Sequence, residues 1–156
     1  MTTKMSTATR RTVRTRICII SDTHDSTPPL PQSDVLIHSG DLTATGRYSQ
    51  LLPQLNHIAS APAELKLVIA GNHDITLDRE YYSVKGKDIH KFFEDGDVES
   101  VDACLSLWKN DDARGTGVRY LEEGMSIHSL SNGAEFRVYA SPYQVCLLRF
   151  HVILNL

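Results

Sequence analysis

The sequence predicts an α/β domain in which buried strands alternate with helices first and an antiparallel hairpin follows. Three short apolar runs rich in β-branched residues each end at a polar string, which is typical of strands buried on both faces. An amphipathic segment between the second and third runs predicts a βαβ arrangement. An Asn-Gly pair between two alternating segments predicts the hairpin. A chain of 156 residues is enough for one domain with a packed core.

The first three predicted strands cover residues 16–21, 34–39 and 65–70. Between the last two, residues 47–60 place Leu51, Leu55 and Ile58 at helical spacing and predict an amphipathic helix. Proline is tolerated only near the first turn of a helix, so Pro53 leaves the start of this helix open.

The second half of the chain is less regular. Residues 75–96 have mixed polarity and no clean period, and predict a loop with a short helix at most. Residues 98–110 place Val101, Cys104, Leu105 and Trp108 on one face and predict a second helix, which ends before a stop at residues 111–117.

The last predicted elements are strands. Residues 118–121 predict a fourth strand, and residues 125–130 and 134–140 alternate around Ser131-Asn132-Gly133. The Asn-Gly pair in this turn is a strong hairpin signal.

Composition narrows the classes of protein. No apolar run approaches the roughly 20 residues of a membrane-spanning helix, so no membrane partner is expected. Residues 1–16 hold five basic residues and no acid, and the rest has eleven basic residues against nineteen acidic ones, a net charge of −8. An acidic body argues against nucleic acid as the main partner. Three scattered cysteines without C-x-x-C spacing suggest neither a disulfide framework nor a zinc knuckle, and favour the reducing cytoplasm.

Residues 1–15 are rich in Ser, Thr and Arg, the composition of an organellar transit peptide. They contain few apolar residues that could form an amphipathic face. We therefore expect a disordered basic tail here.

The polar strings after the first three strands carry the chemistry. They are Asp22-Thr23-His24, Gly40-Asp41 and Gly71-Asn72-His73-Asp74. Open α/β sheets bind ligands at the carboxyl ends of their strands, where these strings lie. At a strand end Asp22 and His24 can point to the same side and grip one cation. Taken alone, each of the first two strings is weak evidence for a metal site, because such residues usually form an ordinary turn after a strand.

Asp41 is a candidate bridge between two metal ions. Two divalent ions about 4 Å apart repel by very roughly 16 kcal/mol at an effective dielectric near 20, so a shared anion is almost required. Gly40 and Gly46 would let the loop bring its backbone close to the site.

The third string supplies candidate ligand and catalytic residues. Asn72 offers a neutral amide oxygen to a second metal, and His73 can turn toward the substrate. An imidazole suits protonation of a leaving alkoxide or stabilisation of charge on a phosphoryl group. Asp74, the second candidate catalytic residue, either orients His73 or caps the following turn.

The order I-S-D-T-H, D-V-L-I-H-S-G-D-L-T and I-A-G-N-H-D resembles a small branch of the calcineurin-like metallophosphoesterase superfamily. The likeness covers residues 16–143, including V-Y-A-S-P-Y at 138–143. It implies a two-sheet β-sandwich flanked by helices that hydrolyses phosphomonoesters or phosphodiesters of a small substrate by in-line attack of metal-activated water.

The resemblance also implies the roles of individual residues. Asp22 and His24 would bind the first metal, Asp41 would bridge, and Asn72 would bind the second metal. His73 would assist the leaving group. Asp, Asn and His ligands admit Mn, Fe or Zn.

The resemblance stops after residue 143. Two downstream family motifs, a Thr-His-Gly-Pro-like loop and a Gly-His-x-His-like loop, do not appear, and residues 144–156 form an apolar tail unlike the family. We therefore expect a partial domain that binds one metal ion or none and exposes apolar surface at its unfinished sandwich. An alternative transcript, a frameshift or a gene-model error would each produce such a chain.

The remaining histidines are not predicted ligands. His38 is interpreted as a strand residue satisfied by local hydrogen bonds, and His57, His90 and His128 as surface or structural residues. His151 is a lone histidine on the apolar tail and is not expected to be a ligand. A catalytically impaired homologue that acts as a binding or regulatory module is the alternative function. A nucleotide-binding α/β protein is disfavoured because no G-x-G-x-x-G or Walker-type loop follows the first strand.

Overall fold

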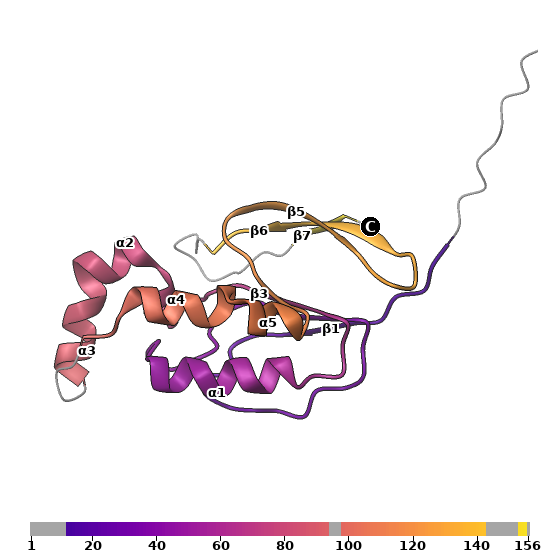
Figure 1. The fold of residues 1–156 in the computed structure, drawn as a ribbon. Coiled ribbons are helices and arrows are strands. Elements are labelled where there is room, and N and C mark those ends of the chain that lie inside the picture. The colour runs from indigo at the N-terminus through magenta and orange to yellow at the C-terminus, as the bar shows by residue number, and fades with distance from the viewer. Residues whose placement is uncertain (1–11, 94–97, 143–152, 156) are drawn as a thin grey trace, which may run out of the picture.

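The computed structural model describes residues 12–93, 98–142 and 153–155 (Figure 1). Four parallel strands form sheet A in chain order: β1 (Ile17–Ile20), β2 (Val35–His38), β3 (Leu65–Val68) and β4 (Val118–Tyr120). These strands confirm the four predicted from the sequence, within two residues at each end. Across the described ranges, no helix is both long and apolar enough to cross a membrane.

Sheet B is antiparallel and contains the predicted hairpin. Its strands are β5 (Gly124–Ser129), β6 (Glu135–Ala140) and β7 (Ile153–Asn155), in that order. In the turn, the Gly133 N–H donates to Leu130 O, so Ser131 and Asn132 are the central residues, and Gly133 follows them with a φ of +90°. This is a three-residue hairpin loop with glycine at its left-handed position. β7 comes from the segment predicted as a divergent tail, and Ile153 pairs with Tyr139.

Helices and sheet B cover opposite faces of sheet A, so the domain has three layers (Figure 1). Val35 and Ile37 on β2 pack against sheet B in one core cluster. Leu36, from the alternate face of β2, packs among the helices in the other cluster. Burial on both faces explains why β2 and β3 are almost continuously apolar. The same expectation was wrong for β1, which lies at the edge of the sheet and leaves Ile19 58% exposed. The predicted two-sheet arrangement with flanking helices is confirmed.

Helix α1 (Tyr48–Ala59) confirms the predicted amphipathic helix and buries Leu51, Leu55 and Ile58. The structure settles the start that Pro53 had left open: the helix begins at Tyr48, and Pro53 lies in its second turn rather than its first. Pro53 and Ser49, four residues earlier, are both exposed. The carbonyl group that loses its helical N–H partner can therefore bind water.

The prediction of a loop at residues 75–96 was wrong. The chain is helical almost throughout the described part of this segment: η1 (Ile75–Leu77), α2 (Arg79–Tyr81), the π-helical η2 (Tyr82–Gly86) and α3 (Lys87–Phe93). All three residues of η1 are buried, and from residue 82 onward the buried side is made by Tyr82, Gly86 and His90, four residues apart. A Cβ on Gly86 would lie 2.4 Å from Cδ2 of Tyr82, so glycine allows the Tyr82 ring to pack there. Glycine and histidine hide this helical period from an apolar pattern search.

Helix α4 (Val101–Lys109) confirms the second predicted amphipathic helix and begins three residues later than expected. The Ser100 side chain accepts a hydrogen bond from Ala103 N and caps the helix. The predicted stop after it is partly wrong. Asn110 caps a further short helix, α5 (Asp111–Gly115), through Ala113 N.

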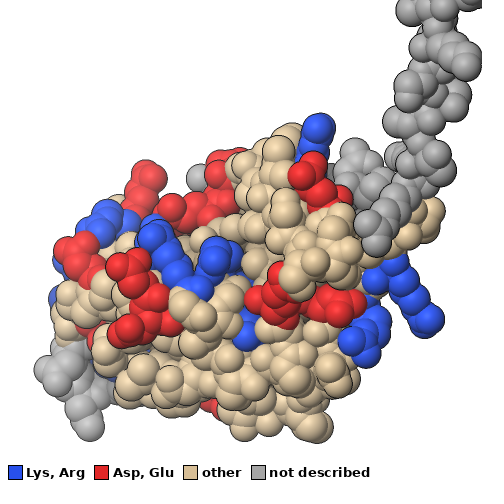
Figure 2. Space-filling model, turned by 45° about the vertical axis from the view of Figure 1, so that its right-hand side comes forward, with Lys and Arg blue, Asp and Glu red and all other residues tan. Residues whose placement is uncertain are grey.

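Acidic and basic side chains are interspersed on the face seen in Figure 2, so the described residues there form no continuous basic patch. Sheet B leaves large apolar side chains exposed: the exposed fraction is 69% for Met125 and 60% for Ile127. Cys18 and Cys104 are free thiols. Cys146 and His151 lie outside the described residues.

His38, the last residue of β2, is buried, and its surroundings match the sequence expectation only in part. Its Nε2 lies 2.9 Å from Thr23 Oγ1, but its Nδ1 has no hydrogen-bond partner among the described residues. Burial lowers the pKa of His38 from 6.5 to about 4, with Asp22 acting to raise it and His57 to lower it. The neutral imidazole is therefore favoured in the folded protein at neutral pH.

We expect the protein to lose stability as the pH falls from 6.5 to about 4, because the unfolded state then binds the proton of His38 first. The contribution of neutral His38 to the free energy of unfolding is fully present above pH 6.5, the pKa in the unfolded state. It falls by about 3 kcal/mol as the pH is lowered through about 4. Urea denaturation in EDTA at several pH values measures it. His38→Gln, which keeps a polar group near Thr23 but does not titrate, should lose less stability over this range. Equal losses in both proteins would refute the assignment.

Candidate metal centre

The three polar strings meet at the carboxyl edge of β1, β2 and β3. The first two loops are hydrogen-bonded to each other beyond the strand ends. The bonds run from Asp22 N to Gly40 O (3.0 Å), from His24 N to Asp41 O (3.1 Å) and from Asp25 N to Leu42 O (3.0 Å). The sheet pairing thus continues into the loops and fixes where their side chains begin.

Glycines allow the second and third strings to cross at backbone contact. Gly40 adopts a φ of +101°, and a Cβ on it would lie 2.8 Å from Gly71 Cα. A Cβ on Gly71 would lie 2.1 Å from Asp41 Oδ1. Gly46, with a φ of +73°, makes a similarly close approach to Ile75 N. Side chains at these positions would push the strings apart.

Three predicted ligands have backbones in the left-handed region. The φ angles are +55° for Asp22, +41° for His24 and +53° for Asp41. Each such residue costs of order 1 kcal/mol or more and persists only when its surroundings hold it, as the loop hydrogen bonds do here. Strain of this kind is concentrated at functional sites in proteins.

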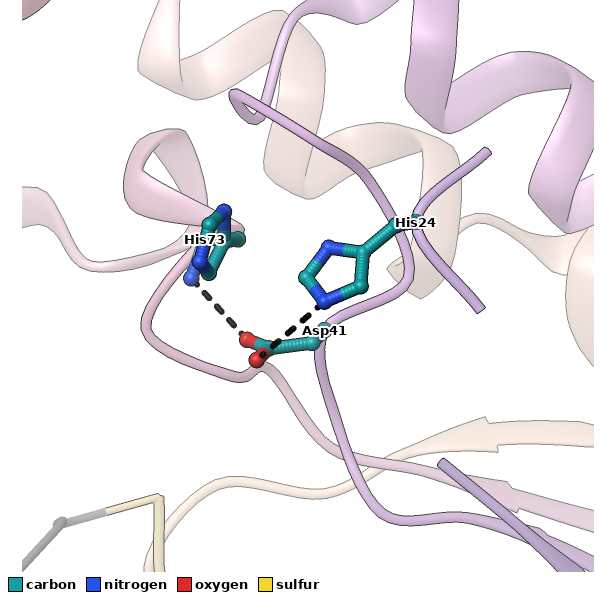
Figure 3. A group of neighbouring side chains, drawn as sticks. All are labelled: His24, Asp41 and His73. Carbon is teal, nitrogen blue, oxygen red and sulfur yellow. Dashed lines mark hydrogen bonds and ion pairs between the residues drawn. The ribbon is translucent and has the colours of Figure 1, made fainter. Parts of the chain in front are cut away.

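His24, Asp41 and His73 converge on one space (Figure 3). Each offers a ligand atom, and these atoms all lie within 4.8 Å of one another. His24 Nε2 is 3.9 Å from Asp41 Oδ2, and the two imidazole rings stand edge to face with centroids 4.5 Å apart. Asp41 is only 4% exposed. A buried carboxylate beside two imidazoles suits a divalent cation.

Hydrogen bonds fix the tautomers of both imidazoles. His24 donates through Nδ1–H to Thr43 O at 3.2 Å, and His73 through Nδ1–H to Ala44 O at 2.8 Å. A carbonyl oxygen only accepts, so each neutral ring keeps its lone pair on Nε2. Metal-binding histidines commonly donate their other N–H to a carbonyl in this way. The residues present therefore fit a bound metal ion.

The structure distributes the predicted site residues unevenly. His24 and Asp41 lie together, and His73, assigned to the substrate side, joins them within the 4.8 Å cluster. The Asp22 carboxylate is not part of that cluster among the described residues. Asn72 is exposed between Gly71 and His73. Its ligand role and that of Asp22 stay predictions.

Asp74 neither orients His73 nor caps the following turn, the two roles considered from the sequence. It is fully buried, and its side chain does not cap η1. The His73 ring is oriented by Ala44 instead. The Asp74 carboxylate accepts hydrogen bonds from Leu42 N (3.1 Å), Thr43 N (3.0 Å), Thr43 Oγ1 (2.7 Å) and Gly71 N (2.9 Å). Burial raises the pKa of Asp74, and these hydrogen bonds oppose the rise. Asp74 therefore ties the second string to the third.

A cavity of about 640 Å³ opens beside the third string. It adjoins the metal cluster through Gly71 and Asn72. Aromatic, charged and aliphatic side chains line the rest of it, among them Arg79, Tyr81, Tyr120 and Leu77. Together with the cluster, it completes a site with metal-binding donors at one side and room for a small molecule at the other.

Imidazole and carboxylate donors at the carboxyl edge of a parallel sheet are typical of α/β proteins that bind a metal ion. Comparison of the sequence with known protein families identifies the family. Residues 15–141 match the family model of calcineurin-like phosphoesterases. The chain therefore belongs to the calcineurin-like phosphoesterase family, as the resemblance of its three strings implied.

Similar proteins come from a fungus and from animals. The chain is 36% identical over 128 residues to a probable rhamnogalacturonate lyase C of Emericella nidulans, covering 82% of the chain and 10% of that protein. It is 34% identical over 138 residues to metallophosphoesterase domain-containing protein 1 of Homo sapiens, covering 83% and 38%. A UPF0046 protein of Caenorhabditis elegans is 28% identical over 133 residues, covering 84% and 45%. The chain thus spans less than half the length of these relatives.

Proposed function

We propose that the chain binds a divalent cation through His24, Asp41 and His73 and hydrolyses a phosphoester bond of a small substrate. The observation that carries the proposal is the convergence of three ligand atoms within 4.8 Å at the loop ends. When bound, such a cation polarises a phosphoryl oxygen and lowers the pKa of a coordinated water toward neutrality. Manganese, iron and zinc all suit the donor set.

The chain's own residues have separate tasks in this proposal. Asp41 provides the negative charge, and its burial keeps that charge close to the cation. His24 and His73 present Nε2 because Thr43 and Ala44 hold their Nδ1–H groups. The cavity next to Asn72 receives the alcohol part of the ester, where Tyr81 and Tyr120 offer apolar ring surface.

A second candidate function is metal binding without turnover, in a binding or regulatory role. The observation that favours it is that the described His, Cys, Asp and Glu residues form a single cluster with three members. Family resemblance implied two metal ions, and one ion gives less charge stabilisation to a transferring phosphoryl group than two.

We expect Asp41→Asn to weaken Mn²⁺ binding at least about 100-fold, since even the loss of a residue that only supports a ligand costs roughly 10–100-fold. Hydrolysis of an activated phosphodiester should fall to background. The fold should survive, because Asn Oδ1 can still accept from His73 N, as Asp41 Oδ1 does at 3.0 Å, and asparagine tolerates the left-handed φ of +53°.

Metal per chain, the dissociation constant and turnover are measured on both proteins, with thermal unfolding as the control. One Mn²⁺ per chain and turnover that requires Asp41 would support hydrolysis. Mn²⁺ binding without turnover in either protein would support the second candidate. Turnover that is unchanged in Asp41→Asn would overturn the proposed site.

A further inference from the structure

Three consecutive carbonyl oxygens of the loop at residues 43–45 accept hydrogen bonds from three different imidazoles. Two of the donors are the candidate ligands His24 and His73, and the third is His90 on α3. The bonds run from His24 Nδ1 to Thr43 O (3.2 Å), from His73 Nδ1 to Ala44 O (2.8 Å) and from His90 Nε2 to Thr45 O (2.7 Å). One short stretch of backbone therefore connects both ligands to a residue outside the metal cluster.

His90 is buried, with 1% of its surface exposed, and both of its ring nitrogens are engaged. Because Thr45 O only accepts, Nε2 carries the proton and Nδ1 has the lone pair. Nδ1 accepts from the Tyr82 hydroxyl at 2.8 Å, and the Tyr82 oxygen in turn accepts from Glu99 N at 2.9 Å. Tyr82 is fully buried. The donors and acceptors thus point in one direction from Glu99 to the loop.

Arg47 provides a second link between the loop at residues 43–45 and helix α3. Its Nη2 donates to His90 O at 3.3 Å, and its Nη1 lies 3.5 Å from Glu99 Oε1. Arg47 directly follows the loop at Gly46, so α3 and the loop are joined on both sides of the Thr45 carbonyl. The loop has little freedom to rotate its peptide planes.

We propose that His90 is a positioning residue for the metal centre. It holds the Thr45 carbonyl, and through the planar peptides of residues 43–45 it sets the direction of the two carbonyls that orient His24 and His73. Each ligand then presents Nε2 to the cation in a single tautomer. The inference rests on the proposed function, since it concerns the same metal site.

The test compares His90→Phe with His90→Gln in the full chain. Phenylalanine fills the volume of the imidazole but cannot donate to Thr45 O, whereas the glutamine amide nitrogen can reach the position of Nε2. We expect His90→Phe to weaken Mn²⁺ binding roughly 10–100-fold, as for other residues that support metal ligands. Binding in His90→Gln should recover to within about threefold of the parent.

The second readout is independent of metal. Long-range ¹H–¹⁵N NMR of the metal-free protein reports which nitrogen of His24 and His73 carries the proton. The parent and His90→Gln should show the Nδ1–H form at both rings, and His90→Phe should show a mixture. A merely structural role would change the unfolding temperature without altering the tautomers.

The proposal is overturned if His90→Phe keeps both the parent tautomers and the parent affinity, or if His90→Gln loses as much as His90→Phe. If His90→Phe fails to unfold cooperatively, Tyr82→Phe replaces it, because it removes only the hydroxyl that holds Nδ1. In Tyr82→Phe we then expect mixed tautomers at His24 and His73. If both rings keep the parent tautomer, the positioning role of His90 is refuted. If the parent binds no Mn²⁺ at all, the proposed function fails, while the tautomers still decide the role of His90.

Discussion

Replacing Gly71 with alanine is expected to abolish tight divalent-metal binding and to lower the free energy of unfolding by about 3 kcal/mol or more. The new Cβ would lie 2.1 Å from Asp41 Oδ1 and 2.2 Å from Asp41 N. Neither atom can move away easily, because the Asp41 backbone is hydrogen-bonded to His24 and Oδ1 accepts from His73 N. The substitution therefore separates the second string from the third.

Gly115→Ala is the matched control for this change. Gly115 ends α5, and a Cβ there would meet no heavy atom within 4 Å. Alanine is a better helix former by up to about 1 kcal/mol, so this variant should be as stable as the parent or slightly more stable. Urea denaturation and Mn²⁺ titration compare the three proteins. Parent-like metal binding in Gly71→Ala would show that the strings do not need this close crossing.

Asp74→Asn is expected to destabilise the protein by about 2–4 kcal/mol and to weaken metal binding. The Asp74 carboxylate serves four donors, and an amide nitrogen cannot accept from any of them. The least costly placement puts the amide nitrogen beside Thr43, whose hydroxyl can turn to accept. Thr43 N then faces another donor in a buried site.

Asp112→Asn is a suitable control for Asp74→Asn because Asp112 is exposed at the start of α5. Its substitution should change the unfolding free energy by no more than about 0.5 kcal/mol. Combining Asp74→Asn with Thr43→Val in a double-mutant cycle isolates the contact between them. Additive effects of the two substitutions would mean that Asp74 and Thr43 are not coupled.

Much of the fold could be predicted from local sequence. The strands at 34–39 and 65–70 are recognisable because burial on both faces demands continuous apolar residues. The run at 16–21 has the same apolar pattern, although β1 lies at the sheet edge and exposes Ile19. The hairpin follows from the alternating segments on either side of a turn in which Gly133 takes the left-handed position. The helices at residues 75–93 could not be predicted in the same way. From residue 82 onward their buried side consists of Tyr82, Gly86 and His90, and its period appears only when a glycine that admits a ring is counted as a core residue.

The candidate site, like the fold, has features that local sequence predicts and features that only tertiary contacts decide. The sequence by itself determined that His24, Asp41 and His73 lie near one another, because the carboxyl ends of neighbouring parallel strands share one edge. Only the tertiary structure decided that Asp74 ties two loops together and that His90 reaches the loop behind the ligands. Those contacts join residues 31 to 45 positions apart through hydrogen bonds to backbone atoms. Every residue type has such backbone atoms, so no pattern of side chains in the sequence can reveal which of them will meet.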